Sequence, residues 1–128
     1  MPAEHPTELE LQLLKILWEE APLPVREVRQ RLADQGRDVA HTTVITILNI
    51  MVEKKFLTRK KHKNAFLFSP KVKQERICGG MVGDIVDRVF DGSARKLMLS
   101  LLETSDVDAE ELREIRRIID RKARESKS

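Results

Sequence analysis

Cysteine and aromatic residues are scarce in this sequence. Cys78 is the only cysteine among 128 residues, there is no tyrosine, and Trp18 is joined by only four phenylalanines. A single cysteine excludes an intrachain disulfide and any metal site made of paired thiolates. With so few aromatic rings, the core of the protein has to be built mainly from aliphatic side chains.

Long hydrophobic runs are missing as well. The longest apolar stretch covers residues 44–52, is interrupted by Thr46 and Asn49, and is far too short to span a bilayer. Residues 1–6 show no basic region followed by an apolar one, so they do not have the pattern of a secretion signal. We therefore expect a cytoplasmic protein with no membrane insertion.

The residue patterns of common enzyme sites do not occur either. The three histidines are expected in a tail, at a helix start and in a loop, without metal-ligand spacing: His5, His41 and His62. Gly79-Gly80 precedes no Lys-Ser/Thr pair, and Cys78 has no histidine near it in sequence that would activate a nucleophile. We expect no catalytic residue, no metal and no cofactor.

Charged and hydrophobic residues, by contrast, are both plentiful. Charged residues make up 35% of the chain and hydrophobic ones 41%, which is typical of a soluble, largely helical protein with a core. The formal net charge of +3 favours a polyanionic partner only weakly, because many ordinary proteins share it. The length suffices for one domain, or for one compact domain and an arm.

The first half of the chain carries the start and stop signals of three helices. Thr7 followed by Glu10 is a capping-box pattern, and it opens a helix that the next two prolines end. A second helix is predicted over residues 25–35, followed by Gly36 as a left-handed cap. A third helix is predicted over residues 42–54.

A β-hairpin is predicted after the third helix. Residues 56–60 and 65–69 have strand character, and they flank a four-residue polar tip at 61–64. Three short helices and a hairpin within about 70 residues follow the order of a winged helix-turn-helix.

The third predicted helix has an apolar face and a polar face. Val44, Ile47, Leu48 and Met51 share the side that is expected to face the core. The opposite side carries the short polar residues Thr42, Thr43, Thr46 and Asn49. Such side chains hydrogen-bond to base edges, and threonine methyl groups meet thymine methyl groups in the major groove. A solvated helix face is the alternative interpretation.

The hairpin is strongly basic. Residues 54–63 contain six positive charges and no acid: Lys54, Lys55, Arg59, Lys60, Lys61 and Lys63. Positive charges on a hairpin next to a candidate recognition helix are placed to meet the phosphates of DNA. We predict that the helix reads bases and that Arg59, Lys60, Lys61 and Lys63 hold the backbone.

The distal part, residues 71–128, is predicted to be helical throughout. It carries an apolar stripe that a thin helical arm cannot bury alone: Leu97, Leu101, Leu112, Ile115 and Ile119. Exposure of this apolar surface to water costs roughly 25 cal/mol of free energy per Å². Packing of two such arms across a two-fold axis removes the cost, and packing against the chain's own first domain is the alternative.

Motifs in both halves, taken in their order and spacing, give the chain a resemblance to the penicillinase and methicillin-resistance repressors, the BlaI/MecI type. The motifs in the first half are Glu8-Leu9-Glu10-Leu11, Ile16-Leu17-Trp18, Val25-Arg26-Glu27-Val28, His41-Thr42-Thr43-Val44, and Ala65, Phe68 and Pro70 of the hairpin. Those in the second half are Phe90-Asp91-Gly92-Ser93, Glu111-Leu112, Ile115-Arg116 and Ile118-Ile119.

The resemblance implies a cytoplasmic homodimer that binds an operator inverted repeat in double-stranded DNA and blocks transcription. It also implies a link to antibiotic resistance, with inactivation when a membrane sensor-protease pathway triggers cleavage in the dimerisation arm. Ser100 and Leu101 stand near the position of the cleaved Asn-Phe bond in the best-known members. Because Ser100 is not Asn, two mechanisms of inactivation are kept as alternatives: proteolysis and binding of a ligand.

Two further positions depart from the family pattern. Lys55 stands where the family usually has a helix-ending glycine, so we expect a non-glycine residue with positive φ there. Ile50 stands where a long basic or polar residue is common, so we expect one phosphate contact fewer.

The predicted fold is mostly α with a small β-hairpin wing. Residues 1–70 are predicted to form a winged-helix DNA-binding domain, and residues 71–128 a helical dimerisation domain. The predicted function is that of a homodimeric DNA-binding transcriptional repressor. The alternative is a winged-helix protein-interaction module that does not bind DNA.

Overall fold

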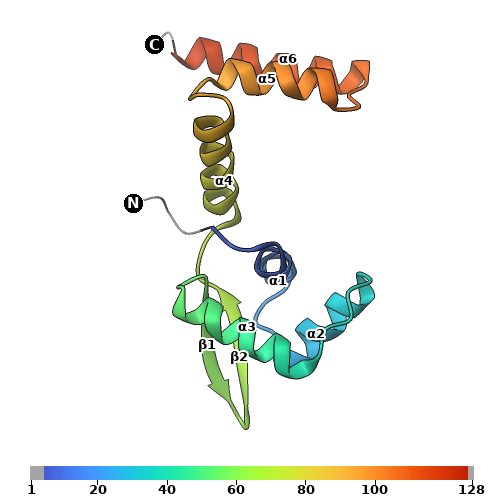
Figure 1. The fold of residues 1–128 in the computed structure, drawn as a ribbon, viewed down its shortest axis with the longest axis vertical. Coiled ribbons are helices and arrows are strands. Elements are labelled where there is room, and N and C mark those ends of the chain that lie inside the picture. The colour runs from blue at the N-terminus through green and yellow to red at the C-terminus, as the bar shows by residue number, and fades with distance from the viewer. Residues whose placement is uncertain (1–4, 127–128) are drawn as a thin grey trace. The chain divides into compact units, whose positions relative to one another are not determined.

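A computed structural model of the chain describes residues 5–126. The described residues form six helices and one antiparallel hairpin (Figure 1), in the order α1 (Glu8–Glu19), α2 (Val25–Asp34), α3 (His41–Glu53), β1 (Leu57–His62), β2 (Ala65–Pro70), α4 (Gln74–Val89), α5 (Ala94–Thr104) and α6 (Ala109–Ser126). The predicted fold class, mostly helical with a small hairpin, is confirmed. The chain divides into two compact units between Gly83 and Asp84, a point inside α4.

Helix α1 begins where the capping-box pattern predicts. The Thr7 hydroxyl accepts a hydrogen bond from the Glu10 N–H at 3.2 Å, and the Glu10 carboxylate accepts one from the Thr7 N–H at 2.8 Å. These two bonds satisfy two N–H groups that have no partner within the helix. The helix ends at its C-cap, Glu20, just before the two prolines.

Helices α2 and α3 form the helix-turn-helix pair. The chain leaves α2 through Gly36, which has a φ of 88°, the left-handed conformation that glycine adopts most easily. The Arg37 N–H then donates to the Leu32 carbonyl at 2.9 Å and closes the turn. In Figure 1, α3 follows α2 after this turn and runs beside the hairpin.

The end of α3 confirms the expectation for Lys55. Its φ is 70°, so a non-glycine residue occupies the left-handed position. The next N–H, from Phe56, donates to the Met51 carbonyl at 2.9 Å, which turns the chain from α3 into β1. The side chain of Phe56 is buried.

The hairpin is longer than its sequence predicts. The register pairs Leu57 with Pro70 at one end and His62 with Ala65 at the other. The predicted four-residue tip is therefore wrong, because the loop holds only Lys63 and Asn64. Lys63 makes this tight turn with a φ of 57°. Polar Lys61 and His62 extend β1 because they are exposed and need no apolar neighbour.

The first unit has one hydrophobic core, to which α1, α2, α3 and the hairpin all contribute. Its members are Leu13, Leu14, Ile16, Leu17, Leu23, Val25, Val28, Leu32, Val44, Leu48, Met51, Phe56, Leu57 and Phe68. Leu23 and Phe68 exchange two backbone hydrogen bonds, 3.1 and 2.9 Å long, so the α1–α2 connection is fixed to β2. The wing is thus part of the same core as the helices.

The residues after the hairpin belong to the same unit. The Trp18 indole N–H donates to the Val72 carbonyl at 2.9 Å, and Val72 and Ile77 pack against the core. A buried or half-buried indole N–H usually needs such a partner. The first turns of α4 therefore have a fixed place on the first unit.

The second unit consists of the end of α4 and the pair α5 and α6. Asp91 and Gly92 both have positive φ, 53° and 79°, and the Ser93 hydroxyl then caps α5 by accepting from the Lys96 N–H at 3.2 Å. Asp108 caps α6 in the same way, since its carboxylate accepts from the Glu111 N–H at 2.8 Å. No residue of α4, α5 or α6, all of which lie within the described part of the chain, is buried.

Candidate nucleic-acid interface

Helix α3 presents the two faces that its sequence predicts. Val44, Leu48 and Met51 are buried in the core, each with at most 1% of its surface exposed. Thr42, Thr43 and Thr46 are exposed on the opposite side. The core fixes the helix by its apolar row, so the polar row is held in a defined position toward solvent.

Two of the predicted base-reading side chains already have hydrogen-bond partners. The Thr46 hydroxyl donates to the Thr42 carbonyl one turn earlier, at 2.8 Å. Asn49 is half-buried, and its side-chain oxygen accepts a hydrogen bond from the Arg59 guanidinium at 2.5 Å. The structure therefore brings Asn49 together with a residue that the sequence assigned to the DNA backbone.

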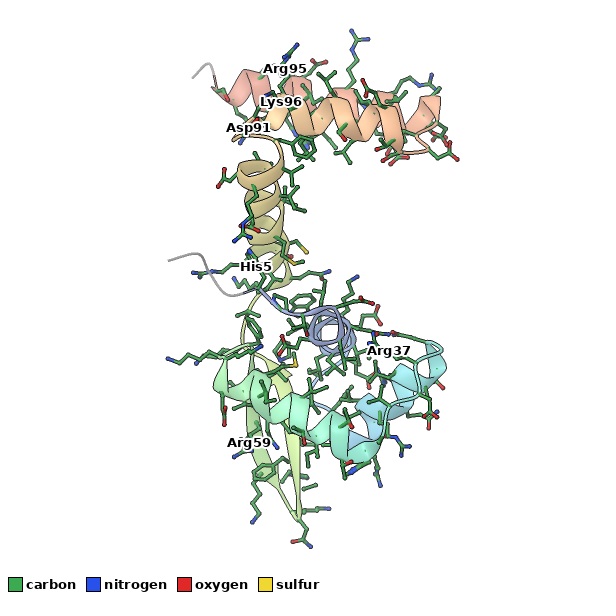
Figure 2. The ribbon with its side chains drawn as sticks, in the orientation of Figure 1. His5, Arg37, Arg59, Asp91, Arg95 and Lys96 are labelled. Carbon is green, nitrogen blue, oxygen red and sulfur yellow. The ribbon has the colours of Figure 1, made fainter. Side chains whose placement is uncertain are left out.

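Arg59 links α3 to the hairpin. Its guanidinium lies 4.6 Å from the centre of the Phe66 ring, a cation–π contact between β1 and β2. The same guanidinium reaches Asn49 on α3. Figure 2 shows Arg59 on the hairpin beside α3. The sequence does not reveal the contacts of Arg59 with Phe66 and Asn49. The spacing of Phe66 and Phe68 in β2 does indicate that the two rings share one face of the strand, the face on which Arg59 lies.

The strand register separates the basic residues of β1 into two sets. Arg59 pairs with Phe68 and Lys61 with Phe66, and side chains two apart in a strand share a face, so Arg59 and Lys61 lie on the α3 side of the hairpin. Lys60 pairs with Leu67 on the other face. Lys63 stands in the loop at the tip. All four predicted backbone-binding cations are exposed.

Lys54, one of the six positive charges in residues 54–63, is paired with an acid from another helix and does not belong to the free basic surface. Its ammonium lies 2.9 Å from the carboxylate of Glu10, which is only 4% exposed. Glu10 therefore joins the cap of α1 to the end of α3. The sequence gives no sign of this pair, because residues 10 and 54 meet only when the helices pack.

The surroundings of Glu10 change the pKa of its carboxyl. Burial raises this pKa, but the hydrogen bond from the Thr7 N–H and the neighbouring Lys54 ammonium outweigh burial. The net result is a pKa below the ordinary value, so Glu10 is charged at neutral pH. The pair is a charged contact that joins the end of α3 to the start of α1.

A cleft of about 490 Å³ opens between the start of α2, α3 and the hairpin. Its walls are both apolar and cationic: Pro24, Val25, Arg26, His41, Ile45, Asn49, Arg59, Asn64, Ala65, Phe66 and Phe68. No acidic side chain lines it. Together with the exposed row of α3, this cleft forms a concave surface with positive charge, which suits a polyanionic backbone.

The distal candidates lie on two helices and are only partly brought together. A groove of about 250 Å³ between α5 and α6 is lined by Leu101, Ile115 and Ile119, among others. Leu97 and Leu112 are not in its lining. Ser100 and Leu101, the predicted cleavage region, lie inside α5, where the Ser100 carbonyl accepts a hydrogen bond from the Thr104 hydroxyl at 2.7 Å.

The described residues carry no sign of a metal site or of a membrane-spanning helix. Between residues 5 and 126, histidine, cysteine and acidic side chains form no group of three that could hold a metal ion. No helix of this part of the chain has the length and apolar character needed to cross a membrane. Cys78 is exposed on α4.

Three packed helices, the third with an exposed polar row, and a basic hairpin fixed beside it define a winged helix-turn-helix. Comparison with known proteins gives the family. The family model described as "Penicillinase repressor" matches residues 6–121. The chain belongs to the penicillinase repressor family.

Individual relatives are distant in sequence but cover most of the chain. The methicillin resistance regulatory protein MecI of Mammaliicoccus sciuri is 24% identical over 113 residues, 88% of this chain and 91% of MecI. The transcriptional regulator BlaI of Mycobacterium tuberculosis is 27% identical over 93 residues, 72% of this chain and 67% of BlaI. The solved structure of RosR from H. salinarum has a TM-score of 0.52 with 19% identity, and the match covers 94% of this chain and 96% of RosR.

Proposed function

We propose that the chain is a homodimeric transcriptional repressor that binds an operator inverted repeat in double-stranded DNA. The observation that carries this proposal is the exposed polar row of α3 beside a wing whose exposed residues from Arg59 to Lys63 include no acid. Relatives that share its family are named as a penicillinase repressor and as methicillin resistance regulators, which makes antibiotic-resistance genes the first candidates for its targets.

The two parts of this surface have different tasks. Thr42, Thr43, Thr46 and Asn49 face the base edges in the major groove. Lys60, Lys61 and Lys63 meet phosphates, and Arg59 fixes the wing against α3 while it contributes charge to the same surface. Base contacts give sequence preference, whereas phosphate contacts give register and salt dependence. Residues 1–70 thus act as the DNA-binding domain, in the cytoplasm and without catalysis.

Dimerisation is assigned to residues 71–128. Exposed apolar side chains gather on α5 and α6, among them Leu101, Leu112 and Ile119, and each is at least 40% exposed. A second copy that covers them in a two-fold arrangement places two recognition helices on two half-sites. Leu97 and Ile115, both half-buried, complete the proposed contact.

Repression can be lifted by two routes in this proposal. The first is cleavage triggered by a membrane sensor-protease pathway. The bond between Ser100 and Leu101 lies in a regular turn of α5. A protease can reach it only after local unfolding, which an exposed helix without buried residues undergoes easily. A ligand that separates the copies is the second route.

Binding to a duplex with the promoter of the chain's own operon tests the proposal. We expect retardation of that duplex at moderate salt, and a much weaker effect on a scrambled duplex of equal length. Thr43→Ala is expected to weaken promoter binding by about 1–3 kcal/mol and to leave scrambled DNA nearly unaffected. If neither duplex is bound, the winged helix is a protein-interaction module and the proposal is wrong.

A further inference from the structure

The exposed row of α3 contains one large apolar residue. Ile50 is 39% exposed, although it belongs to the helix that supplies Leu48 and Met51 to the core. It lies four residues after Thr46 and seven after Thr43, so the three side chains form one row on the helix surface. Ile50 therefore points to the surface that is proposed to enter the major groove.

Thr46 adds a second apolar group to this row. Its hydroxyl hydrogen is already donated to the Thr42 carbonyl, in the i to i−4 geometry that helical threonines often adopt. The remaining substituent on its β-carbon is the methyl group. Since residues four apart on a helix are neighbours, the methyl of Thr46 and the side chain of Ile50 form a continuous apolar strip.

The side-chain amide of Asn49 is also less available for hydrogen bonds to bases than that of a free asparagine. An asparagine recognises adenine through its side-chain oxygen and nitrogen together, as a bidentate pair. Here the oxygen already accepts a hydrogen bond from Arg59. Two of the polar groups on this face are thus engaged within the protein, and the apolar strip is what this end of the helix offers to DNA.

We infer that Thr46 and Ile50 read the 5-methyl groups of thymine in the major groove, which makes them the specificity-determining residues for one or two T·A pairs in each half-site. Thymine is the only standard base that presents a methyl group in that groove. An exposed isoleucine gains nothing from a phosphate, but it gains from contact with a methyl group that leaves water. This inference rests on the proposed DNA-binding function and adds the chemical feature that is read.

The probe for a test is a duplex that the full chain selects from a randomised library. In that duplex each thymine is replaced in turn by deoxyuridine, which removes only the methyl group. We expect one or two positions per half-site at which the wild-type chain loses about fourfold in affinity, the factor that burial of one methyl group is worth. At the position that Ile50 contacts, Ile50→Ala is expected to bind thymine and uracil equally.

Two variants of Thr46 separate the methyl group from the hydroxyl. Thr46→Val keeps a methyl group in place and is expected to retain the preference for thymine over uracil. Thr46→Ser keeps the hydroxyl and is expected to reduce that preference by about two- to fourfold. Thr58→Ser, which removes the same methyl group from an exposed threonine on β1, is the matched control and is expected to change nothing. Thermal melting of each variant checks that the fold is kept.

The outcomes distinguish failure of the DNA-binding function from failure of the inference that thymine methyl groups are read. If the library yields no preferred sequence, the DNA-binding function itself is wrong and the inference falls with it. If a preferred sequence emerges but uracil is tolerated everywhere, the function stands and the inference is overturned. The inference is also overturned if Ile50→Ala keeps the full preference for thymine, or if Thr46→Val loses it while Thr46→Ser keeps it.

Discussion

The two units of the chain differ in what they bury. In the first unit, three helices and the hairpin enclose one core of leucine, valine, isoleucine, methionine and phenylalanine side chains. In the second unit α5 and α6 are apolar along one side, yet none of their described residues is buried. Ile118 and Leu102, for example, keep 55% and 52% of their surface exposed.

This difference shows which unit is complete by itself. Apolar burial is the main favourable term in folding, so the first unit has its own source of stability. In the second unit, none of the apolar residues on α5 and α6 is buried by the residues that the structure describes. Under the proposed dimerisation, the second unit gains its stability from association of two copies, and in an obligate dimer stability depends on protomer concentration.

The largest expected effect concerns the closed core of the first unit. Phe68→Ala removes a side chain of β2 that is 1% exposed and belongs to this core, and we expect a loss of about 3–5 kcal/mol in the free energy of unfolding. Urea denaturation followed by Trp18 fluorescence measures this loss. Leu67→Ala, on the other face of β2, is the control and is expected to cost less than about 1 kcal/mol. Equal costs would show that the wing is not part of the core.

The next effect concerns the open surface of the second unit. Ile115→Asp places a carboxylate in the proposed contact between two copies, and we expect the dimer dissociation constant to rise by about 100-fold, roughly 3 kcal/mol. Arg117→Asp introduces the same residue on the opposite side of α6 and should leave the dimer intact. Sedimentation velocity over a range of concentrations compares the two variants. Two equally stable dimers would place the interface elsewhere.

A smaller effect is expected at the charged pair that joins α1 to α3. Glu10→Gln should lower the free energy of unfolding at pH 7 by about 1–3 kcal/mol, because a charged hydrogen-bonded pair is lost. The pKa of Glu10 is lower in the folded chain than the unfolded value near 4.5, so the unfolded state binds more protons between these values. The contribution of the pair is therefore present above pH 4.5 and is lost as the pH falls through the folded pKa.

Denaturation curves of the wild type and of Glu10→Gln at several pH values test this sign. The difference in stability between them should be largest near neutral pH and should shrink below about pH 4.5. A difference that stays constant down to pH 3 would mean that the Glu10 charge contributes nothing to stability.

The smallest effect concerns the two faces of the wing. Lys61 shares the face of Arg59, next to α3, whereas Lys60 lies on the other face. Lys61→Ala should reduce the slope of log affinity against log salt by about 0.9, the value for one lost phosphate contact. Lys60→Ala should also reduce the slope, but by less, because Lys60 lies on the face away from α3. Equal reductions would show that both faces of the wing lie equally close to the phosphates.

Much of the first unit is predictable from sequence because its signals are local. The capping residues Thr7 and Glu10, the left-handed Gly36 and the apolar row of α3 each act within a few residues, and all of them have the predicted role. The positive φ of Lys55 is likewise a local consequence of the tight turn from α3 into β1.

The features that sequence did not reveal depend on tertiary contacts. Glu10 and Lys54 are 44 residues apart and meet only through packing. The hydrogen bond between Arg59 and Asn49 joins a strand to a helix, so neither residue shows it alone. The length of the hairpin was missed because exposed Lys61 and His62 resemble loop residues, although an exposed strand accepts them equally well.

Cutting the chain within the second unit tests the central claim most directly, since it splits α5 and detaches α6 from the first unit, which stays intact. A specific protease site is inserted between Ser100 and Leu101, and the mass and operator affinity of the uncut and cut proteins are measured in parallel. We predict that the uncut protein is a dimer that holds its operator, and that the cut protein sediments as a monomer with at least about 100-fold weaker operator binding. An unchanged mass and affinity after complete cutting would contradict the claim that the distal helices join two copies on the operator.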